Sequence, residues 1–166
     1  MKKILLLLLV VTLFGCSGNR VLLDELSNKG TGESPTMYYE GQLFSGIGFT
    51  LYDNGQIISE ESYKDGKKDG LSTGWEYDGK LWYEESYKDG EKDGLWKGWD
   101  GDGKLSYEES YKDGVNDGLW KRWYKNGQLK WEENFKDGKR DGVWNGWSED
   151  GQVEFEWNYK DGELRL

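Results

Sequence analysis

Glutamate recurs at two fixed positions of a 24-residue period, and paired carboxylates are the residues of this chain best suited to chemistry. One column contains Glu61, Glu85, Glu109 and Glu133, and the other contains Glu60, Glu84, Glu108, Glu132 and Glu156. Two carboxylates could serve as acid and base in glycoside hydrolysis. That chemistry needs two different environments, whereas a repeat places every copy in nearly the same one. We therefore expect a protein that is not an enzyme.

The composition excludes further classes of function. The chain contains no histidine, so it cannot use imidazole as a base or as a metal ligand. The formal charge is −10, and it becomes −12 once Lys2 and Lys3 are removed with a signal segment. Such a surface repels phosphate backbones. The sequence thus predicts no cofactor, no metal site and no nucleic-acid partner.

Tryptophan is the residue type best suited to binding. One column contains Trp96, Trp120 and Trp144, and another contains Trp75, Trp99, Trp123 and Trp147. Rows of aromatic rings at repeat spacing can stack on sugar rings or hold apolar side chains of a protein. The alternative is that these rings only hold together a thin sheet with few aliphatic residues. A single sheet cannot bury both faces, so we treat all seven as candidate partner-binding residues.

The N-terminus carries a different kind of site. Lys2 and Lys3 precede an apolar run that ends at Phe14-Gly15-Cys16, and this run is too short to span a bilayer. It resembles a bacterial lipoprotein signal, which implies removal of residues 1–15 and lipid attachment at Cys16. An ordinary signal peptide with a chance cysteine is the alternative. The resemblance implies a bacterial envelope location with membrane contact through the lipid anchor only, and Ser17 favours the outer membrane.

Residues 16–36 lack any repeat and are predicted to be a lipidated N-terminus and tether. Within them, residues 20–27 form either one or two turns of amphipathic helix or part of a disordered spacer. The following array, residues 37–166, is a domain of its own. A tetrad ending in Lys-Asp-Gly marks it, at 63–66, 87–90, 111–114, 135–138 and 159–162. Two glycine columns keep the same 24-residue step, so self-similarity of this kind indicates a repeat architecture.

Each repeat is predicted to be a β-hairpin. In the fourth, residues 119–124 and 129–135 are strands, and Asn126-Gly127 between them favours a two-residue type I′ turn. A wider turn is expected at 136–142. Five such units predict an all-β fold, an elongated antiparallel meander of about ten strands. Edge strands at Gly46 and near Tyr159 are then open to pairing with a second copy of the chain.

A two-residue turn at Asn126-Gly127 also fixes the register. Trp120 then pairs with Glu133, Arg122 with Trp131, and Tyr124 with Leu129. In three other copies the Arg122 position is glycine and its partner is aromatic: Gly74 with Tyr83, Gly98 with Tyr107, and Gly146 with Phe155. A ring over a glycine protects that weak position of a sheet. One face then carries these rings with Leu81, Leu105, Leu129 and Val153, and the other carries Trp75, Trp99, Trp123 and Trp147 among charged pairs.

The unit 117–129, with Glu132-Glu133 and the tetrad at 135–138, resembles the bacterial variant of the MORN (membrane occupation and recognition nexus) repeat. Residues 44–46 followed by 52–55 are similar to the opening unit of such arrays. The resemblance covers about residues 37–166 and implies an elongated sheet of stacked hairpins with interaction functions. Many bacterial relatives are described as antitoxin-like, but a lipid-anchored chain departs from a cytoplasmic antitoxin. The family offers no catalytic residues to carry over.

Signal, repeat and charge together predict a non-enzymatic envelope lipoprotein that presents an acidic, tryptophan-rich sheet to an unidentified protein partner. A glycan-binding module of the cell wall is the first alternative. An antitoxin-like or immunity role is the second. A homodimer through the sheet edges is compatible with each of the three.

Overall fold

The structure is a computed structural model that describes residues 19–29 and 35–165. Of the described residues 67% are in β-strands, and the only helical element among them is a 3-10 turn, η1 (Leu23–Glu25). The N-terminal strands are β1 (Asn19–Leu22), β2 (Ser27–Asn28), β3 (Met37–Tyr39) and β4 (Gln42–Leu43). The repeats supply β5 (Gly46–Leu51), β6 (Ile57–Lys64), β7 (Lys67–Trp75), β8 (Leu81–Lys88), β9 (Glu91–Trp99), β10 (Leu105–Lys112), β11 (Val115–Asn116), β12 (Gly118–Trp123), β13 (Leu129–Lys136), β14 (Lys139–Trp147), β15 (Val153–Lys160) and β16 (Glu163–Arg165). Among these residues there is no helical segment with the length and hydrophobicity of a membrane span.

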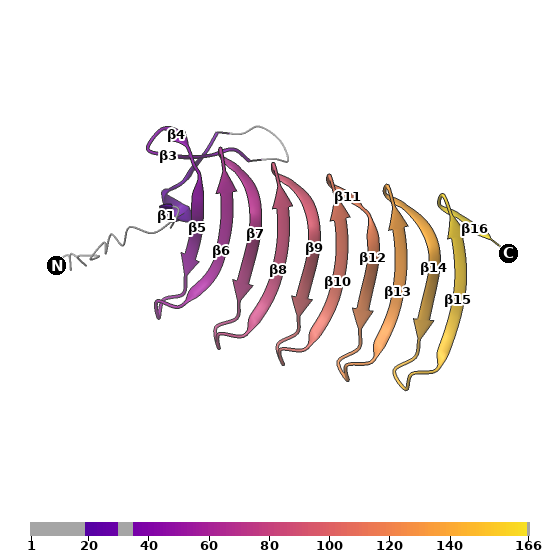
Figure 1. The fold of residues 1–166 in the computed structure, drawn as a ribbon. Coiled ribbons are helices and arrows are strands. Elements are labelled where there is room, and N and C mark those ends of the chain that lie inside the picture. The colour runs from indigo at the N-terminus through magenta and orange to yellow at the C-terminus, as the bar shows by residue number, and fades with distance from the viewer. Residues whose placement is uncertain (1–18, 30–34, 166) are drawn as a thin grey trace.

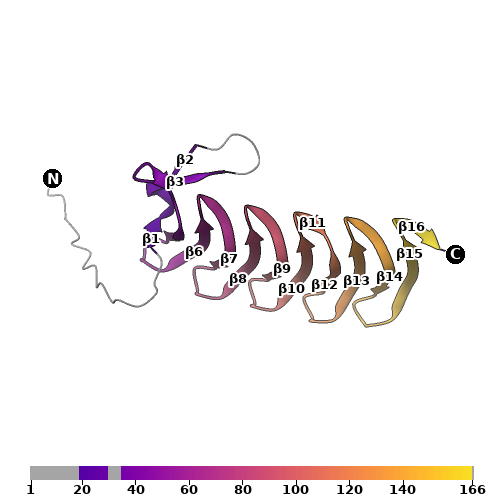
Figure 2. The same ribbon diagram turned by 45° about the horizontal axis from the view of Figure 1, so that its top comes forward.

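The strands of the repeats form one sheet in which neighbours in sequence are neighbours in space. The order is β1-β5-β6-β7-β8-β9-β10-β12-β13-β14-β15-β16, with β11 also paired to β10. All pairs are antiparallel except β1 with β5, which is parallel. The strands bow in the same direction, so the array is a curved single layer that extends along the chain (Figures 1 and 2). The predicted all-β meander of hairpins is confirmed.

The tight turns lie at the Lys-Asp-Gly tetrads and not at Asn126-Gly127. Lys136 pairs directly with Lys139, and the two residues between them have positive φ, 47° at Asp137 and 78° at Gly138. This is the pair of conformations that a type I′ turn requires. The same pattern recurs at Asp65-Gly66, Asp89-Gly90, Asp113-Gly114 and Asp161-Gly162. The expectation of a wider turn at 136–142 is therefore wrong.

The turn at Asn126-Gly127 is longer than predicted. Gly127 donates to the carbonyl of Tyr124, Tyr124 donates to the carbonyl of Gln128, and Gly127 alone in this loop has positive φ. These bonds describe a three-residue loop with a glycine bulge, which inserts one residue into the strand. Leu129 consequently pairs with Trp123, and the predicted Tyr124–Leu129 pair is wrong.

Hydrogen bonds between consecutive repeats hold the tight turns in line. The turn glycine donates its N–H to a carbonyl 22 residues earlier, for example from Gly138 to Asn116 at 2.9 Å. A carboxylate of the previous repeat accepts from the turn aspartate, as Asp117 does from Asp137 at 3.1 Å. The same bonds join Asp89 to Asp69, Asp113 to Asp93, and Asp161 to Asp141. The Asp-Gly pair of each tetrad thus forms a tight turn, and the Asp-Gly pair that follows it, such as Asp117-Gly118, fixes the next tight turn.

An N-terminal cap, residues 19–29 and 35–45, covers the first edge of the sheet. Asn19 of β1 pairs with Gly46 of β5, so this edge is not open as the sequence suggested. Strands β2, β3 and β4 form a separate three-stranded sheet, and a small core of Val21, Leu26, Phe44 and Tyr63 lies beneath it. Residues 20–27 therefore form strand and a 3-10 turn in place of an amphipathic helix. Cys16 lies outside the described residues.

Candidate functional site

The sheet has two faces of different chemistry. We call one the aromatic face; it carries Tyr63, Tyr87, Tyr111, Phe135 and Tyr159, Trp96, Trp120 and Trp144, and Glu61, Glu85, Glu109 and Glu133. We call the other the leucine face; it carries Leu71, Leu95, Leu119 and Val143, the second glutamate column, and Trp75, Trp99, Trp123 and Trp147. The observed pairs Trp120–Glu133 and Arg122–Trp131 confirm the predicted register at this point. Alternation along each strand then divides the side chains between the faces.

On the aromatic face Trp96 and Trp120 belong to one continuous row of tilted rings, whereas Trp144 packs in a separate group with Phe155, Trp157 and Tyr159. Trp96 lies between Tyr87 and Tyr111, with centroids 5.2 Å from each, and Trp120 follows at 5.3 Å from Tyr111 and 5.0 Å from Phe135. The Trp120 indole donates to the carbonyl of Ser110 at 3.0 Å, and Trp96 does the same to Ser86. Both sides of these rings are thus in use. This column holds neighbouring hairpins together and offers little free ring surface to a ligand.

Rings also cover the glycines of this face. A Cβ atom at Gly98 would lie 2.1 Å from the Tyr107 ring, and the rings of Tyr83 and Phe155 lie equally close over Gly74 and Gly146. In the fourth repeat Arg122 replaces the glycine, and its guanidinium lies 4.5 Å from the Tyr107 centroid and 5.5 Å from that of Trp131. The predicted glycine–aromatic and arginine–tryptophan pairs are both confirmed.

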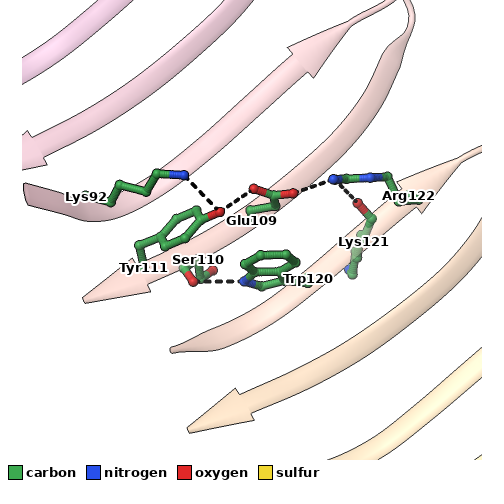
Figure 3. Close-up of polar contacts among 7 residues, drawn as sticks. All are labelled: Lys92, Glu109, Ser110, Tyr111, Trp120, Lys121 and Arg122. Carbon is green, nitrogen blue, oxygen red and sulfur yellow. Dashed lines mark hydrogen bonds and ion pairs between the residues drawn. The ribbon is translucent and has the colours of Figure 1, made fainter. Parts of the chain in front are cut away.

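The glutamates of the aromatic face are bound into a polar network, which Figure 3 shows around Glu109. Tyr111 donates its hydroxyl to Glu109 at 2.6 Å, and Lys92 donates to the same hydroxyl at 3.4 Å. Arg122 forms an ion pair with the other carboxylate oxygen of Glu109, Oε1. The Glu109 residue is only 8% exposed, so its charge requires these partners. Burial, followed by the bond to the carboxylate, raises the pKa of Tyr111, which therefore remains a donor.

Equivalent contacts recur along the row. Glu61 accepts from Tyr63 and pairs with Lys68 at 3.2 Å, and Glu133 pairs with Arg140. Glu85 differs, because among the described residues it has the hydroxyl of Tyr87 at 2.9 Å but no ion pair. Burial raises the pKa of Glu85, and the bond from Tyr87 opposes this shift only in part. Three of the four carboxylates thus have a cationic partner and Glu85 has none within the described part of the chain, so their environments are less alike than the repeat argument predicted.

The unpaired Glu85 leads to a prediction about pH. Its raised folded-state pKa means that ionisation destabilises the fold, so stability should increase as pH falls through that pKa. Glu85→Gln, which keeps an acceptor for Tyr87, should therefore raise the urea midpoint at pH 7, with the gain vanishing below about pH 4. Glu109→Gln is the matched control, because it removes the partner of Arg122 and should lower the midpoint. A lower midpoint for Glu85→Gln at pH 7 would contradict the argument.

The leucine face is more open. Its apolar row is Leu71, Leu95, Leu119 and Val143, with exposed fractions of 47% at Leu71 and 39% at Leu95 and Val143. A charged row follows, in which Lys97 lies 3.7 Å from Glu108 and Lys121 is the ladder partner of Glu132. A third row pairs Trp75 with Leu81, Trp99 with Leu105, Trp123 with Leu129, and Trp147 with Val153. These leucines and the valine were expected on the aromatic face; the bulges place them opposite the tryptophans.

The structure therefore separates the seven candidate tryptophans. Trp96, Trp120 and Trp144 lie in the aromatic face, whereas Trp75, Trp99, Trp123 and Trp147 are half-buried on the leucine face. The sequence interpretation missed the exposed row that begins at Leu71. Its signal was present as a fourth column with the 24-residue step, directly after the glycines Gly70, Gly94, Gly118 and Gly142.

Comparison with known proteins agrees with this division into hairpins. A family model described as the MORN repeat variant matches residues 44–65, 68–89, 92–113, 116–137 and 140–161. Each matched segment contains one hairpin built around a longer loop, such as β9 and β10 within 92–113. No curated protein matched the chain.

Proposed function

The chain belongs to the MORN repeat variant family, and from that premise we propose that it binds a protein partner through the leucine face. MORN repeats generally mediate protein or membrane interactions and are generally non-catalytic. The observation that carries the proposal is the contrast between the faces. On the aromatic face most rings and carboxylates contact one another, whereas on the leucine face Leu71, Leu95 and Val143 are exposed to water. Exposed apolar rows of this kind are typical of interaction surfaces.

The second part of the proposal concerns location. A lipid attached to Cys16 holds the protein at the bacterial envelope, in the outer membrane. Support comes from the signal-like run that ends at Gly15-Cys16. Strand β1 begins only three residues later, at Asn19, so the anchor holds the capped end of the array close to the membrane.

Replacement of the anchor residue tests this location. Cys16→Ser should move the protein from the membrane fraction to the soluble envelope fraction, because a serine cannot take the thioether-linked lipid. The measurement is cell fractionation with immunoblotting. Ser17→Ala is the control and should remain in the membrane. Equal membrane retention of Cys16→Ser would argue against the anchor.

The partner-binding role has a direct experiment of its own. The chain from Ser17 onward is used to capture proteins from solubilised envelope, and mass spectrometry reads the result. One protein at near-stoichiometric yield, lost with Trp99→Ala plus Trp123→Ala while circular dichroism is unchanged, is the expected outcome. Replacement of two buried aromatic anchors typically weakens an interface by about 100-fold or more. Recovery of no specific protein, or equal capture by the double variant, would count against the leucine face.

A further inference from the structure

The leucine side chains of the apolar row on the leucine face are longer than the side chains that lie opposite them on the neighbouring strands. Across each hairpin the members of this row pair with short polar residues: Leu71 with Ser86, Leu95 with Ser110, Leu119 with Asn134, and Val143 with Asn158. Serine and asparagine are shorter than leucine, so the aliphatic side chains project beyond the surface. Leu71 is 47% exposed and Leu95 and Val143 are 39% exposed, whereas Leu119 is half-buried.

The spacing of the row matches an α-helix. Its members lie on β7, β9, β12 and β14, so each step crosses two strands, which is about 9.4–9.8 Å. Seven residues of an α-helix rise about 10.5 Å and return to nearly the same face. An extended strand covers about 10 Å in three residues, but side chains three residues apart point to opposite sides of the strand. Such a strand could contact only every second member of the row. A helix laid across the strands can therefore meet every member of the row, whereas a strand cannot.

The charged row indicates what lies on one flank of the apolar stripe of such a helix, whereas the exposed Lys88, Lys112 and Lys136 of the same face lie on the other flank. Across the span of the apolar row the charged row contains Glu84, Glu108, Glu132 and Glu156 against Lys97 and Lys121. Glu84 and Glu156 have no ion pair among the described residues. This row lies two residues further along each strand, about 6.6 Å from the leucines. That distance is close to the radius of a helix with its side chains, about 5–6 Å, so residues on the helix flank reach it.

From spacing, exposure and charge we propose that the leucine face binds an amphipathic helix that lies across the strands and is basic along one flank. The helix presents an apolar residue at every seventh position to Leu71, Leu95, Leu119 and Val143, and lysine or arginine to the charged row. Contact with all four members spans about 29 Å, and four apolar residues at every seventh position require a helix of about 22 residues. The inference rests on the proposed partner-binding function and specifies the chemistry of the partner.

Synthetic peptides test the inference on the full chain after the signal. The probe is a 22-residue helix with leucine at positions 1, 8, 15 and 22, lysine on the one flank that meets the charged row, and alanine and glutamine elsewhere. A peptide of the same composition, with the leucines distributed around the helix, is the first control. Fluorescence anisotropy should show saturable binding of the probe and at least tenfold weaker binding of the control, since only the probe presents an apolar stripe. Equal affinity for both peptides would overturn the proposal.

Variants locate the binding site. Leu95→Ser should weaken the probe by about tenfold, because one apolar anchor of four is removed. Val115→Ser is matched, since Val115 is also exposed, at 45%, but lies on β11 outside the row; it should change the affinity by less than about twofold. Glu84→Lys provides a second variant that spares the apolar row, and it should weaken the basic probe. An equal loss for Leu95→Ser and Val115→Ser would exclude this row as the site.

The two proposals fail in different ways. Capture of a partner that depends on Trp99 and Trp123 but is unaffected by Leu95→Ser and Glu84→Lys would retain the binding function and reject the helix. Failure of both the capture and the peptide titration would reject both.

Discussion

Trp120→Ala is expected to remove about 3–5 kcal/mol from the free energy of unfolding, the usual cost of truncating a packed tryptophan. Trp120 connects Tyr111 of the third repeat to Phe135 of its own, and its indole donates to Ser110. Repeat arrays are stable through contacts between neighbours, so loss of this ring also uncouples the two halves of the sheet. Urea unfolding should accordingly change from one transition to two. The measurement is tryptophan fluorescence together with far-UV circular dichroism.

Two further variants separate the contributions. Trp120→Phe keeps a ring in the stack and loses the bond to Ser110, so it should cost about 1 kcal/mol. Trp123→Ala removes a tryptophan of the leucine face, which has no ring contact among the described residues, and should cost less than half as much as Trp120→Ala. If Trp123→Ala were as destabilising as Trp120→Ala, the two tryptophan columns would share one structural role and the division between the faces would fail.

Much of this architecture could be predicted from the sequence because a repeat multiplies every local signal. A single glycine opposite a tyrosine would carry little weight, but Gly74, Gly98 and Gly146 each oppose a ring at the same repeat position. Agreement among three copies fixed the register, and the register fixed which side chains share a face. The family resemblance reached the same fold independently, and the matched segments confirm it.

The two turn types could not be predicted, for a physical reason. Asn-Gly and Asp-Gly both tolerate positive φ, so both sites of each repeat suit a type I′ turn locally. Contacts between repeats decide the outcome. The N–H groups of Asp137 and Gly138 meet acceptors at Asp117 and Asn116, which a wider loop would leave without these donors. Such contacts join residues about 20 apart and are invisible in a local pattern.

The capped edge was missed because β1 belongs to no repeat. Residues 19–22 have no periodicity to align, and their parallel pairing with β5 depends on the path of the chain through η1 and β2. The exposed row beginning at Leu71 was missed differently. Its column is visible in the sequence, but the exposure of its members depends on the short side chains opposite them, which only the strand pairing shows.

Gly46→Ala tests how the cap is attached. A Cβ atom at Gly46 would lie 2.1 Å from the backbone carbonyl oxygen of Asn19, and a backbone atom of a paired strand cannot move aside as a side chain can. The variant should therefore detach β1 from β5 and expose the buried Val21 and Leu26. Two aliphatic side chains returned to water correspond to about 3 kcal/mol or more. Hydrogen exchange should show faster labelling of residues 19–22 and of β5, while β9 to β15 remain protected.

Detachment also exposes the paired groups of β5, and a free edge of this kind is a site for pairing with another chain. The Gly46→Ala variant should thus sediment partly as a dimer at concentrations at which the wild-type chain does not dimerise through this edge. Gly101→Ala is the matched control, because a Cβ atom at Gly101 meets nothing within 4 Å, and it should leave both exchange and sedimentation unchanged. If β1 were as protected from exchange in Gly46→Ala as in the wild type, the close approach of Asn19 to Gly46 would not be what fixes the cap. The contacts of the Val21 and Leu26 core alone would then hold β1 at the first edge of the sheet.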